Sequence, residues 1–350
     1  MIRLLFVGES WRGSCARSLR EALARRVDVT MEEVAEDLFI PKARDRLLRA
    51  SIRLLAPLHR RELESAIFDR VESFQPDVLM AYKGYHITSE LVRSVRQMGV
   101  RTVNVYPDCS PHAFGTAHRE AVGSYDLVIS TKPFHAPRWR STYGFSNECW
   151  FVPQGYDPLL HYRGQPPAEQ DLDVALVATW RPEYGDLMRE LASMLGDHRL
   201  RVGIGGAGWK DNSAGLPGGW RVLGPVTGSI YVESLRRARI CIAPVTRHIV
   251  VNGAIQPGDV DSTRTYELAA AHCFFVHRRT DFVRTLYDEL TEVPMFEDAA
   301  ELSRHILRFL NEPDQRARMA LAAHQRAVPA YSLDQRAGEI VGILGGVRQA

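Results

Sequence analysis

The sequence lacks the features that mark disulfide-stapled, zinc-binding and membrane-spanning proteins. Its 350 residues include five cysteines, an odd number with no CxxC pair, so neither a disulfide framework nor a zinc site is predicted. The apolar run near the start, Ile2 to Val7, is too short for a signal sequence or a membrane span. Together these absences favour a reducing cytoplasm as the compartment.

An excess of charge of one sign is also missing. The 44 basic and 42 acidic side chains give a net charge of +2, which argues against a nucleic-acid-coating protein. The hydrophobic share of 45% is that of an ordinary globular protein, and the length suits two domains that each bury a core. The locally basic stretch from Lys42 to Arg61 is interpreted first as a solvated helical face and second as a membrane- or acceptor-facing patch. Peripheral membrane contact therefore stays open.

The loop after the first expected strand lacks a dinucleotide fingerprint. The strand Ile2 to Val7 runs into GESWRGS and then a helix from about Ser14 to Arg25. Gly8 and Gly13 allow a ligand to approach the backbone, but their spacing is not GxGxxG. A nicotinamide-dependent enzyme is therefore disfavoured.

The first half alternates buried strands with helices, which predicts a doubly wound α/β domain over residues 1–160. Strands are expected near 78–82, 101–108, 125–130 and 148–152. The carboxyl ends of parallel strands are where such sheets bind ligands. Three residues on the loops at these ends are candidate general bases for an acceptor hydroxyl group: His86, Asp108 and His112.

The same pattern repeats after a stretch rich in proline and glycine, residues 153–170, which is interpreted as an inter-domain linker. A second α/β domain is predicted over 170–330, with a long loop after the strand CIAPV. The chain then turns helical near 299–310, 313–327 and 332–344. The last segment, 331–350, is expected to return to the first domain.

The stretch from Asp259 to Val276 has the pattern of an anion site followed by a helix and a buried strand. Asp261, Ser262 and Thr263 are good N-cap types, so the free N–H groups of a helix start would point at a ligand, for which phosphate is the natural guest. Arg264 adds a forked cation. Glu267 would be repelled by a phosphate unless it were engaged otherwise, for example by accepting hydrogen bonds from two sugar hydroxyl groups.

Four loops of the second domain are expected to converge on this helix start, and their basic residues suit a diphosphate group. A DxD triplet is absent; the segment from Asp259 to Asp261 is a near miss, and no metal site is predicted. The basic residues are Arg181, Lys210, Arg247 and Arg264.

The spacing of Asp259 and Glu267, with seven residues between them, resembles the acidic pair of the group 1 glycosyltransferases of the GT-B fold. The stretch STRTYELAAAHCFFV is similar to the R-x-[FY]-E-x-x-A-x-G motif of the spore-maturation-type branch of that group. The pieces PDVLMAYKG, YDLVISTK, VPQGYDPLLH and DVALVATWRPE agree with that branch in order. Two positions depart from it, since Asp259 replaces a glutamate and His272 stands where many relatives carry glycine.

The resemblance implies two Rossmann-like domains facing a central cleft. The C-terminal domain would hold a nucleotide-diphosphate sugar, and the N-terminal domain would bind an acceptor of unknown class: a glycan, a lipid-linked sugar, a protein or a small molecule. Glu267 would bind the ribose hydroxyls and Arg264 with Arg181 the diphosphate, without an obligatory metal or a further cofactor. Two alternatives stay open: a GT-B nucleotide-sugar epimerase, and a catalytically silent nucleotide-sugar-binding protein.

Overall fold

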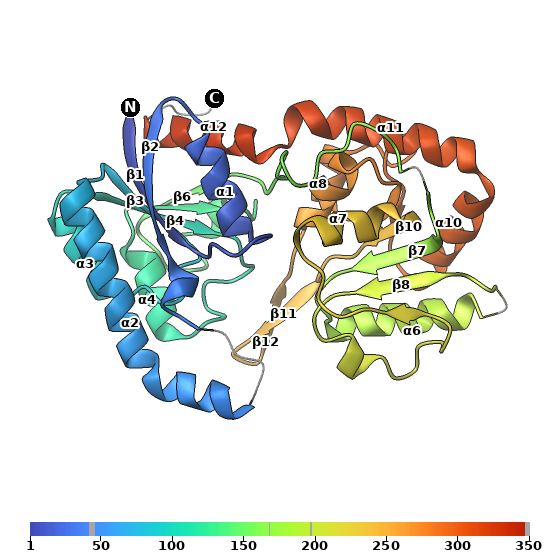
Figure 1. Ribbon diagram of the computed structural model, residues 1–350, viewed down its shortest axis with the longest axis horizontal. Helices are drawn as coiled ribbons and strands as arrows, with labels where there is room; N and C mark the ends of the chain where they lie inside the picture. Colours follow the sequence, from blue (N-terminus) through green and yellow to red (C-terminus); the bar gives the residue numbers. More distant parts are fainter. Residues whose placement is uncertain (42–45, 168, 197, 347–350) are drawn as a thin grey trace. The chain divides into compact units, whose positions relative to one another are not determined.

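The computed structural model of the chain describes residues 1–41, 46–167, 169–196 and 198–346 (Figure 1). The chain separates into two compact units. The first consists of Met1–Pro153, Ile249–Pro257 and Asp334–Ala350, and the second of Gln154–His248 and Gly258–Leu333. Among the described residues, no helix combines the length and the apolar composition that a membrane crossing requires.

The first unit is built on a six-stranded parallel sheet of order β2-β1-β3-β4-β5-β6. The strands are β1 (Ile2–Gly8), β2 (Val29–Ala35), β3 (Val78–Tyr82), β4 (Arg101–Tyr106), β5 (Leu127–Ser130) and β6 (Glu148–Phe151). The helices are α1 (Cys15–Ala24), α2 (Arg46–Phe74), α3 (Ser89–Gln97), α4 (Thr116–Ser124), α5 (His135–Arg138) and α12 (Leu333–Leu344), with a 3-10 turn η1 (Glu36–Leu38).

Strand β3, at the centre of this sheet, is apolar along its whole length, as is typical of a parallel strand that is covered on both faces. Every residue of β3 is buried. One face packs against α2, whose residues Leu63, Ile67 and Val71 recur every four positions and therefore share one side of the helix. One core of the unit thus lies between the sheet and α2, and a second contains Tyr106, Val128 and Trp139.

The second unit repeats this design with a six-stranded sheet of order β14-β13-β10-β7-β8-β9. The strands are β7 (Leu172–Val177), β8 (Val202–Gly205), β9 (Arg221–Val222), β10 (Ala238–Ala243), β13 (Phe275–Arg278) and β14 (Met295–Phe296). The helices are α6 (Pro182–Met194), α7 (Gly228–Arg236), α8 (Thr263–Ala270), α9 (Asp281–Leu286), α10 (Ala299–Asn311) and α11 (Pro313–Ala330), with a 3-10 turn η2 (Lys210–Asn212).

Two apolar cores flank the second sheet. One core contains Met188 of α6 and Ile306 of α10, and the other contains Val232 of α7 and Leu268 of α8. Residues Leu268 to Ala270 of α8 have no exposed surface, so this helix is fixed against the sheet. Its position sets where the side chains of its first turn can reach.

The prediction of a long loop after CIAPV is wrong, because this segment contains a β-hairpin. Strands β11 (His248–Val251) and β12 (Ala254–Pro257) pair through a two-residue turn. Asn252 and Gly253 both have positive φ, 51° and 79°, as the favoured hairpin turn requires. The Asn-Gly dipeptide between two short runs is itself a strong hairpin signal in the sequence.

The segment interpreted as an inter-domain linker is packed rather than free. Tyr156 is 2% exposed, and its hydroxyl group donates to the carbonyl oxygen of Val328 at 2.9 Å. It packs beside Tyr266 of α8. At the end of the chain, α12 lies in the first unit, where the carbonyl oxygen of Leu344 accepts a hydrogen bond from Arg101 at 2.9 Å.

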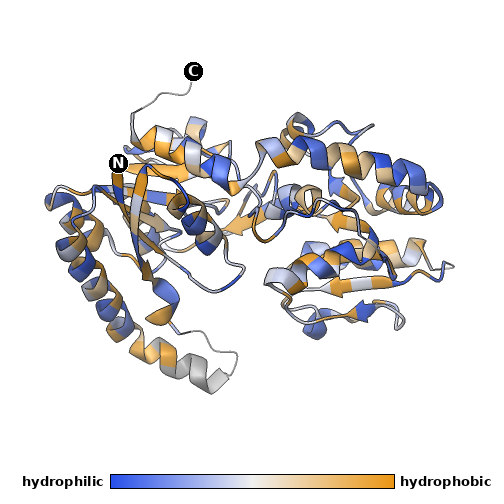
Figure 2. Ribbon diagram, turned by 45° about the horizontal axis from the view of Figure 1, so that its top comes forward, coloured by the Kyte–Doolittle hydropathy of each residue, from blue (hydrophilic) through white to orange (hydrophobic). Residues whose placement is uncertain are grey.

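The basic stretch from Lys42 to Arg61 falls partly outside the described residues, which resume at 46. In the described part, Arg60 and Arg61 are exposed on α2, in keeping with a solvated face. Leu54, Leu55 and Leu58 are exposed there too, and this end of α2 is coloured as hydrophobic in Figure 2.

A buried histidine of the first unit makes its stability depend on pH. His135 has no exposed surface; Nε2 donates to the carbonyl oxygen of Cys109 at 2.9 Å, and Nδ1 lies 2.6 Å from Ser130 Oγ. Burial lowers the pKa of His135 from 6.5 to about 4, so the unfolded chain takes up the proton first as the pH falls. The contribution of the neutral His135 ring to the free energy of unfolding is therefore fully present above pH 6.5 and is lost as the pH falls toward 4.

We therefore expect the free energy of unfolding to fall, for this histidine alone, by about 1 kcal/mol between pH 6.5 and about 5.5. Urea unfolding curves of the wild type and of His135→Gln across this range measure the effect. The variant should be less stable at neutral pH but should lose less stability on acidification. Parallel pH dependences of the two proteins would contradict the assignment.

Candidate active site

Helix α8 begins at the carboxyl end of the second sheet, with Ser262 as its N-cap residue. The backbone N–H of Ser262 donates to Thr265 Oγ1 at 3.0 Å, and that oxygen lies 2.8 Å from Nε2 of His277, which ties the first turn to β13. Asp261 is fully buried and accepts a hydrogen bond from the Tyr266 hydroxyl group at 2.7 Å. The first N–H groups of a helix have no acceptor within it, so this end of α8 attracts an anion.

Glu267 lies one turn into α8 and is buried, with 8% of its surface exposed. Its Oε2 accepts a hydrogen bond from the Tyr231 hydroxyl group of α7 at 2.6 Å, and its Oε1 lies 3.6 Å from Nε2 of His161. A carboxylate offers about four acceptor positions, so these contacts leave capacity for hydroxyl groups of a ligand. They also hold the carboxylate in one orientation.

Both partners of Glu267, Tyr231 and His161, present a hydrogen-bond donor to its carboxylate. The backbone N–H of Asp157 donates to Nδ1 of His161 at 3.0 Å, so the neutral ring carries its proton on Nε2, the atom that faces Glu267. Burial and the charge of Glu267 raise the pKa of Tyr231 well above its ordinary value of 10, which keeps the phenol protonated. Sequence reasoning missed both residues, although His161 ends the quoted segment VPQGYDPLLH.

Arg264 lies one turn before Glu267 and holds its guanidinium group at the start of α8. Its Nη2 donates to the carbonyl oxygen of Pro244 at 3.2 Å. Its buried Nε has no hydrogen-bond partner among the described residues. Because a guanidinium group has five N–H donors, donors remain for an anion at this end of the helix.

Hydrogen bonds join the loops at the carboxyl ends of the strands. The backbone N–H of Trp180 donates to the carbonyl oxygen of Ala207 at 2.8 Å, which links the loops after β7 and β8. The Asp259 N–H donates to the carbonyl oxygen of Thr246 at 2.7 Å, which links the segment before α8 to the loop after β10. The loops therefore form one connected surface around the start of α8.

Gly206 allows two of these loops to approach each other. Its φ is +130°, and a Cβ atom at this position would lie 1.9 Å from the carbonyl oxygen of Ala178. We expect Gly206→Ala to lower the free energy of unfolding by about 2 kcal/mol or more, since the backbone must move. Gly219→Ala is the matched control, because nothing lies within 4 Å of its Cβ position. Equal thermal unfolding curves for the two variants would contradict this account.

The other predicted donor-site residues lie on the same loops. Arg181 is the exposed N-cap residue of α6, and Lys210 is exposed at the start of η2. Arg247 is exposed after β10, and its backbone N–H donates to the Glu183 carboxylate at 3.1 Å. The structure thus brings Arg181, Arg247, Asp259, Ser262, Thr263 and Arg264 to one edge of the second sheet; their roles toward a ligand stay predictions.

In the first unit, Asp108 lies just beyond β4 and accepts a hydrogen bond from the Tyr85 hydroxyl group. The Tyr85 ring packs on Phe114, with ring centroids 4.3 Å apart, and on His118 at 4.9 Å. His118 is buried, and burial lowers its pKa from 6.5 to about 4, so it is neutral near pH 7. The carboxylate of Asp108 therefore lies beside an aromatic cluster.

The two other candidate bases lie at the same edge of the first sheet. His112 Nε2 accepts a hydrogen bond from Arg119 Nε at 3.1 Å, which occupies the nitrogen that would take a proton. His86 is more open, and its Nε2 lies 3.9 Å from Glu36 Oε1. The structure places all three candidates but gives none of them a substrate, so the general base stays a prediction.

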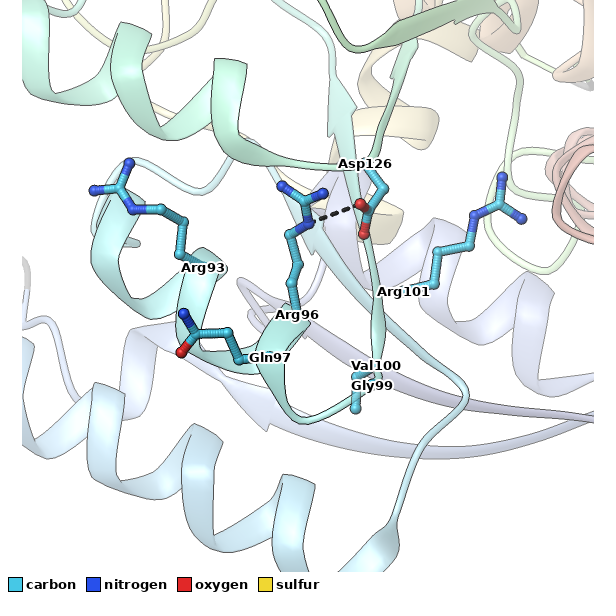
Figure 3. A pocket seen from close by; sticks show the side chains of 7 residues that line it. All are labelled: Arg93, Arg96, Gln97, Gly99, Val100, Arg101 and Asp126. Atoms are coloured by element: carbon cyan, nitrogen blue, oxygen red, sulfur yellow. Dashed lines mark ion pairs between the residues drawn. The ribbon is translucent and has the colours of Figure 1, made fainter.

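A hollow of about 670 Å³ on the first unit contains three arginines, shown in Figure 3. Arg96 Nε pairs with Asp126 Oδ1 at 2.7 Å, and the guanidinium groups of Arg93 and Arg101 point away from each other. Because the three cations do not converge on one point, this hollow is not a candidate anion site.

Comparisons with known proteins agree with the fold. Residues 183–342 match the family model described as glycosyl transferase-like. The chain is similar to sucrose-phosphate synthase from Thermosynechococcus elongatus, with 13% identity, 99% of both chains covered and a TM-score of 0.67. It is also similar to HepE from Anabaena in complex with UDP, with 13% identity, 99% of this chain and 100% of that chain covered and a TM-score of 0.66. A search of curated proteins found no match.

The chain therefore has the GT-B fold, with two Rossmann-like halves and helices at its C-terminal end, as the sequence predicted. The match over 183–342 covers α8 and most of the second unit. The family match supports a glycosyltransferase.

Proposed function

We propose that the protein transfers a sugar from a nucleoside diphosphate sugar, bound by the second unit, to an acceptor bound by the first. The observation that carries the proposal is the buried carboxylate of Glu267, held by Tyr231 and His161 one turn from Arg264. The carboxylate can accept hydrogen bonds from the two neighbouring hydroxyl groups of a ribose. The guanidinium group of Arg264 and the start of α8 suit the diphosphate attached to that ribose.

One structural relative, solved in two complexes, supports uracil as the first base to test. HepE from Anabaena has been solved with UDP and with UDP-glucose. We also propose that the chain belongs to the spore-maturation-type branch and acts in the cytoplasm. The stretch around Arg264 and Glu267 supports the first assignment, and the odd number of cysteines without a CxxC pair supports the second.

Groups of the chain itself are proposed to stabilise the negative charge that develops on the leaving diphosphate. The start of α8 and the guanidinium of Arg264 are fixed in place by packing and by Pro244, so they need little rearrangement during the reaction. Arg181 and Arg247 on the neighbouring loops add charge. We therefore propose transfer without an obligatory metal ion.

The acceptor is proposed to bind at the carboxyl ends of the first sheet, near Asp108, His86 and His112. Asp108 is the strongest of the three as a general base, because its carboxylate lies just beyond the end of β4 beside Tyr85. His112 already accepts a hydrogen bond from Arg119. The acceptor class is left to experiment.

Calorimetric titration with UDP, GDP, dTDP and CMP sugars tests the proposal. We expect one nucleotide class to bind, with the same affinity in the presence of a chelator. Incubation of that donor with mixed acceptors should then yield a glycosylated product. Epimerisation of the donor without any acceptor would favour an epimerase instead, and tight binding without turnover would favour a silent binding protein.

A further inference from the structure

A cavity of about 500 Å³ in the second unit lies at the amino ends of its strands, behind α8. Its walls come from residues 164–167 and 170, the starts of β10 and β13, and the first turns of α11. This is the edge of the sheet opposite to the start of α8. The cavity is therefore separate from the site that contains Glu267.

The charged residues that line this cavity are both cationic. Arg239 and Arg316 face it, and the described residues of its wall include no carboxylate. Arg316 is held by the carbonyl oxygens of Phe309 and Leu310, and no acidic side chain among the described residues pairs with it. Both guanidinium groups belong to the wall of this one cavity, and burial together with the positive charge of Arg239 lowers the pKa of Arg316. An anion bound between them would reduce the repulsion between the two cations.

One carboxylate outside the cavity does not cancel this charge. Asp173 Oδ1 lies 3.2 Å from Arg239 Nη1, but the same oxygen also accepts a hydrogen bond from Arg201 at 3.1 Å. Asp173 is thus shared between two arginines. The cavity keeps a net positive charge.

The remaining wall is mainly apolar. Phe274, Ala320 and Leu321 line one part of it, and Pro166 and Pro167 line another. Such a surface favours the flat or branched apolar body of a small molecule, while the arginines fix its charged end.

His272 provides a third polar group and an unusual backbone. It is the left-handed residue that ends α8, with φ of 58°, a position that glycine normally fills without steric cost. Its ring stacks on His324, with centroids 4.5 Å apart and planes 15° apart. It is 7% exposed, and its buried Nδ1 has no hydrogen-bond partner in the part of the chain that the structure describes. A side chain kept at this position lines the cavity where glycine would leave it open.

We propose that this cavity binds a small organic anion, with a carboxylate or phosphomonoester group between Arg239 and Arg316 and an apolar body against Phe274 and the two prolines. Because His272 ends the helix that carries Glu267, the ligand would contact the far end of α8.

Calorimetry of the full chain with four probes tests this site. Benzoate and phenyl phosphate carry the charge and the apolar ring, benzamide is a neutral analogue, and inorganic phosphate lacks the ring. We expect one or both of the first two to bind, and the stronger one identifies the anionic group. Benzamide and inorganic phosphate should bind at least about tenfold more weakly, since each lacks one half of the recognition.

Variants place the binding in this cavity. Ala317→Trp fills its rim and should abolish binding, and Arg239→Gln should weaken it at least about tenfold. Arg221→Gln, an exposed arginine outside the cavity, and Arg264→Gln, at the other end of α8, should leave binding unchanged. No binding of either anion, equal binding of benzamide, or binding that survives Ala317→Trp and Arg239→Gln would overturn the proposal. The readout is binding, so it does not depend on sugar transfer.

Discussion

Replacing Glu267 by alanine is expected to weaken the binding of a nucleoside diphosphate by about 100-fold or more, because two ribose hydroxyl groups lose a charged acceptor. The carboxylate is buried and held by Tyr231 and His161, so it is already oriented before a ligand binds. Calorimetric titration with the nucleoside diphosphate selected from the panel measures the loss. The corresponding 2′-deoxynucleotide should lose less affinity, because it makes one contact fewer in the wild type.

Two control variants separate this role from a structural one. Glu233→Ala removes a carboxylate of α7 that is 59% exposed and should leave binding unchanged. Tyr231→Phe keeps the Glu267 carboxylate but removes a donor to it, and should cause a smaller loss. If the ribonucleotide and its deoxy analogue lost the same affinity in Glu267→Ala, Glu267 would not contact the ribose.

Replacing Arg264 by glutamine is expected to reduce nucleoside diphosphate binding by about 100-fold, because the diphosphate loses a forked cation that is already in place. The Pro244 carbonyl oxygen holds the guanidinium at 3.2 Å, so little ordering remains to be done when the ligand binds. The free nucleoside, which has no phosphate, should bind the variant and the wild type equally. A titration series of diphosphate, monophosphate and nucleoside measures this difference.

Arg284→Gln on α9 is the matched control, since Arg284 is exposed and lies on a different helix. Its affinity for the diphosphate should equal that of the wild type. An equal loss for the nucleoside and the diphosphate in Arg264→Gln would instead indicate a general disturbance of α8.

Most of the architecture followed from the sequence because most strands of the two parallel sheets are short apolar runs between helices. Strand β2, VTMEEVA, was not predicted, because its middle residues are polar and only partly buried. Val78 to Tyr82 is buried along its whole length, and the sequence pattern alone predicted it. The hairpin around Asn252 and Gly253 was missed because its strands are exposed, Val250 at 71% and Ile255 at 74%, so no buried period marks them. Only the turn dipeptide identifies it.

The candidate site was predictable in part, for a physical reason. Arg264 and Glu267 stand three residues apart on one helix, so local spacing places them on one side of it. Tyr231 and His161 reach Glu267 from segments distant in sequence, and only the tertiary fold brings them together. The segment with His161 was interpreted as a linker because it is rich in proline and glycine. This composition predicts a loop but does not show whether the loop is packed against the protein. Tyr156, buried at 2%, shows that this one is packed.

Hydrogen–deuterium exchange with a saturating nucleoside diphosphate tests the central claim most directly. We predict slower exchange in the peptides that cover 178–185 and 259–267, which contain the loop after β7 and the start of α8, and no slowing there in the Arg264→Gln, Glu267→Ala double variant. Binding that leaves 259–267 unprotected while slowing exchange elsewhere would contradict the claim that this helix start holds the donor.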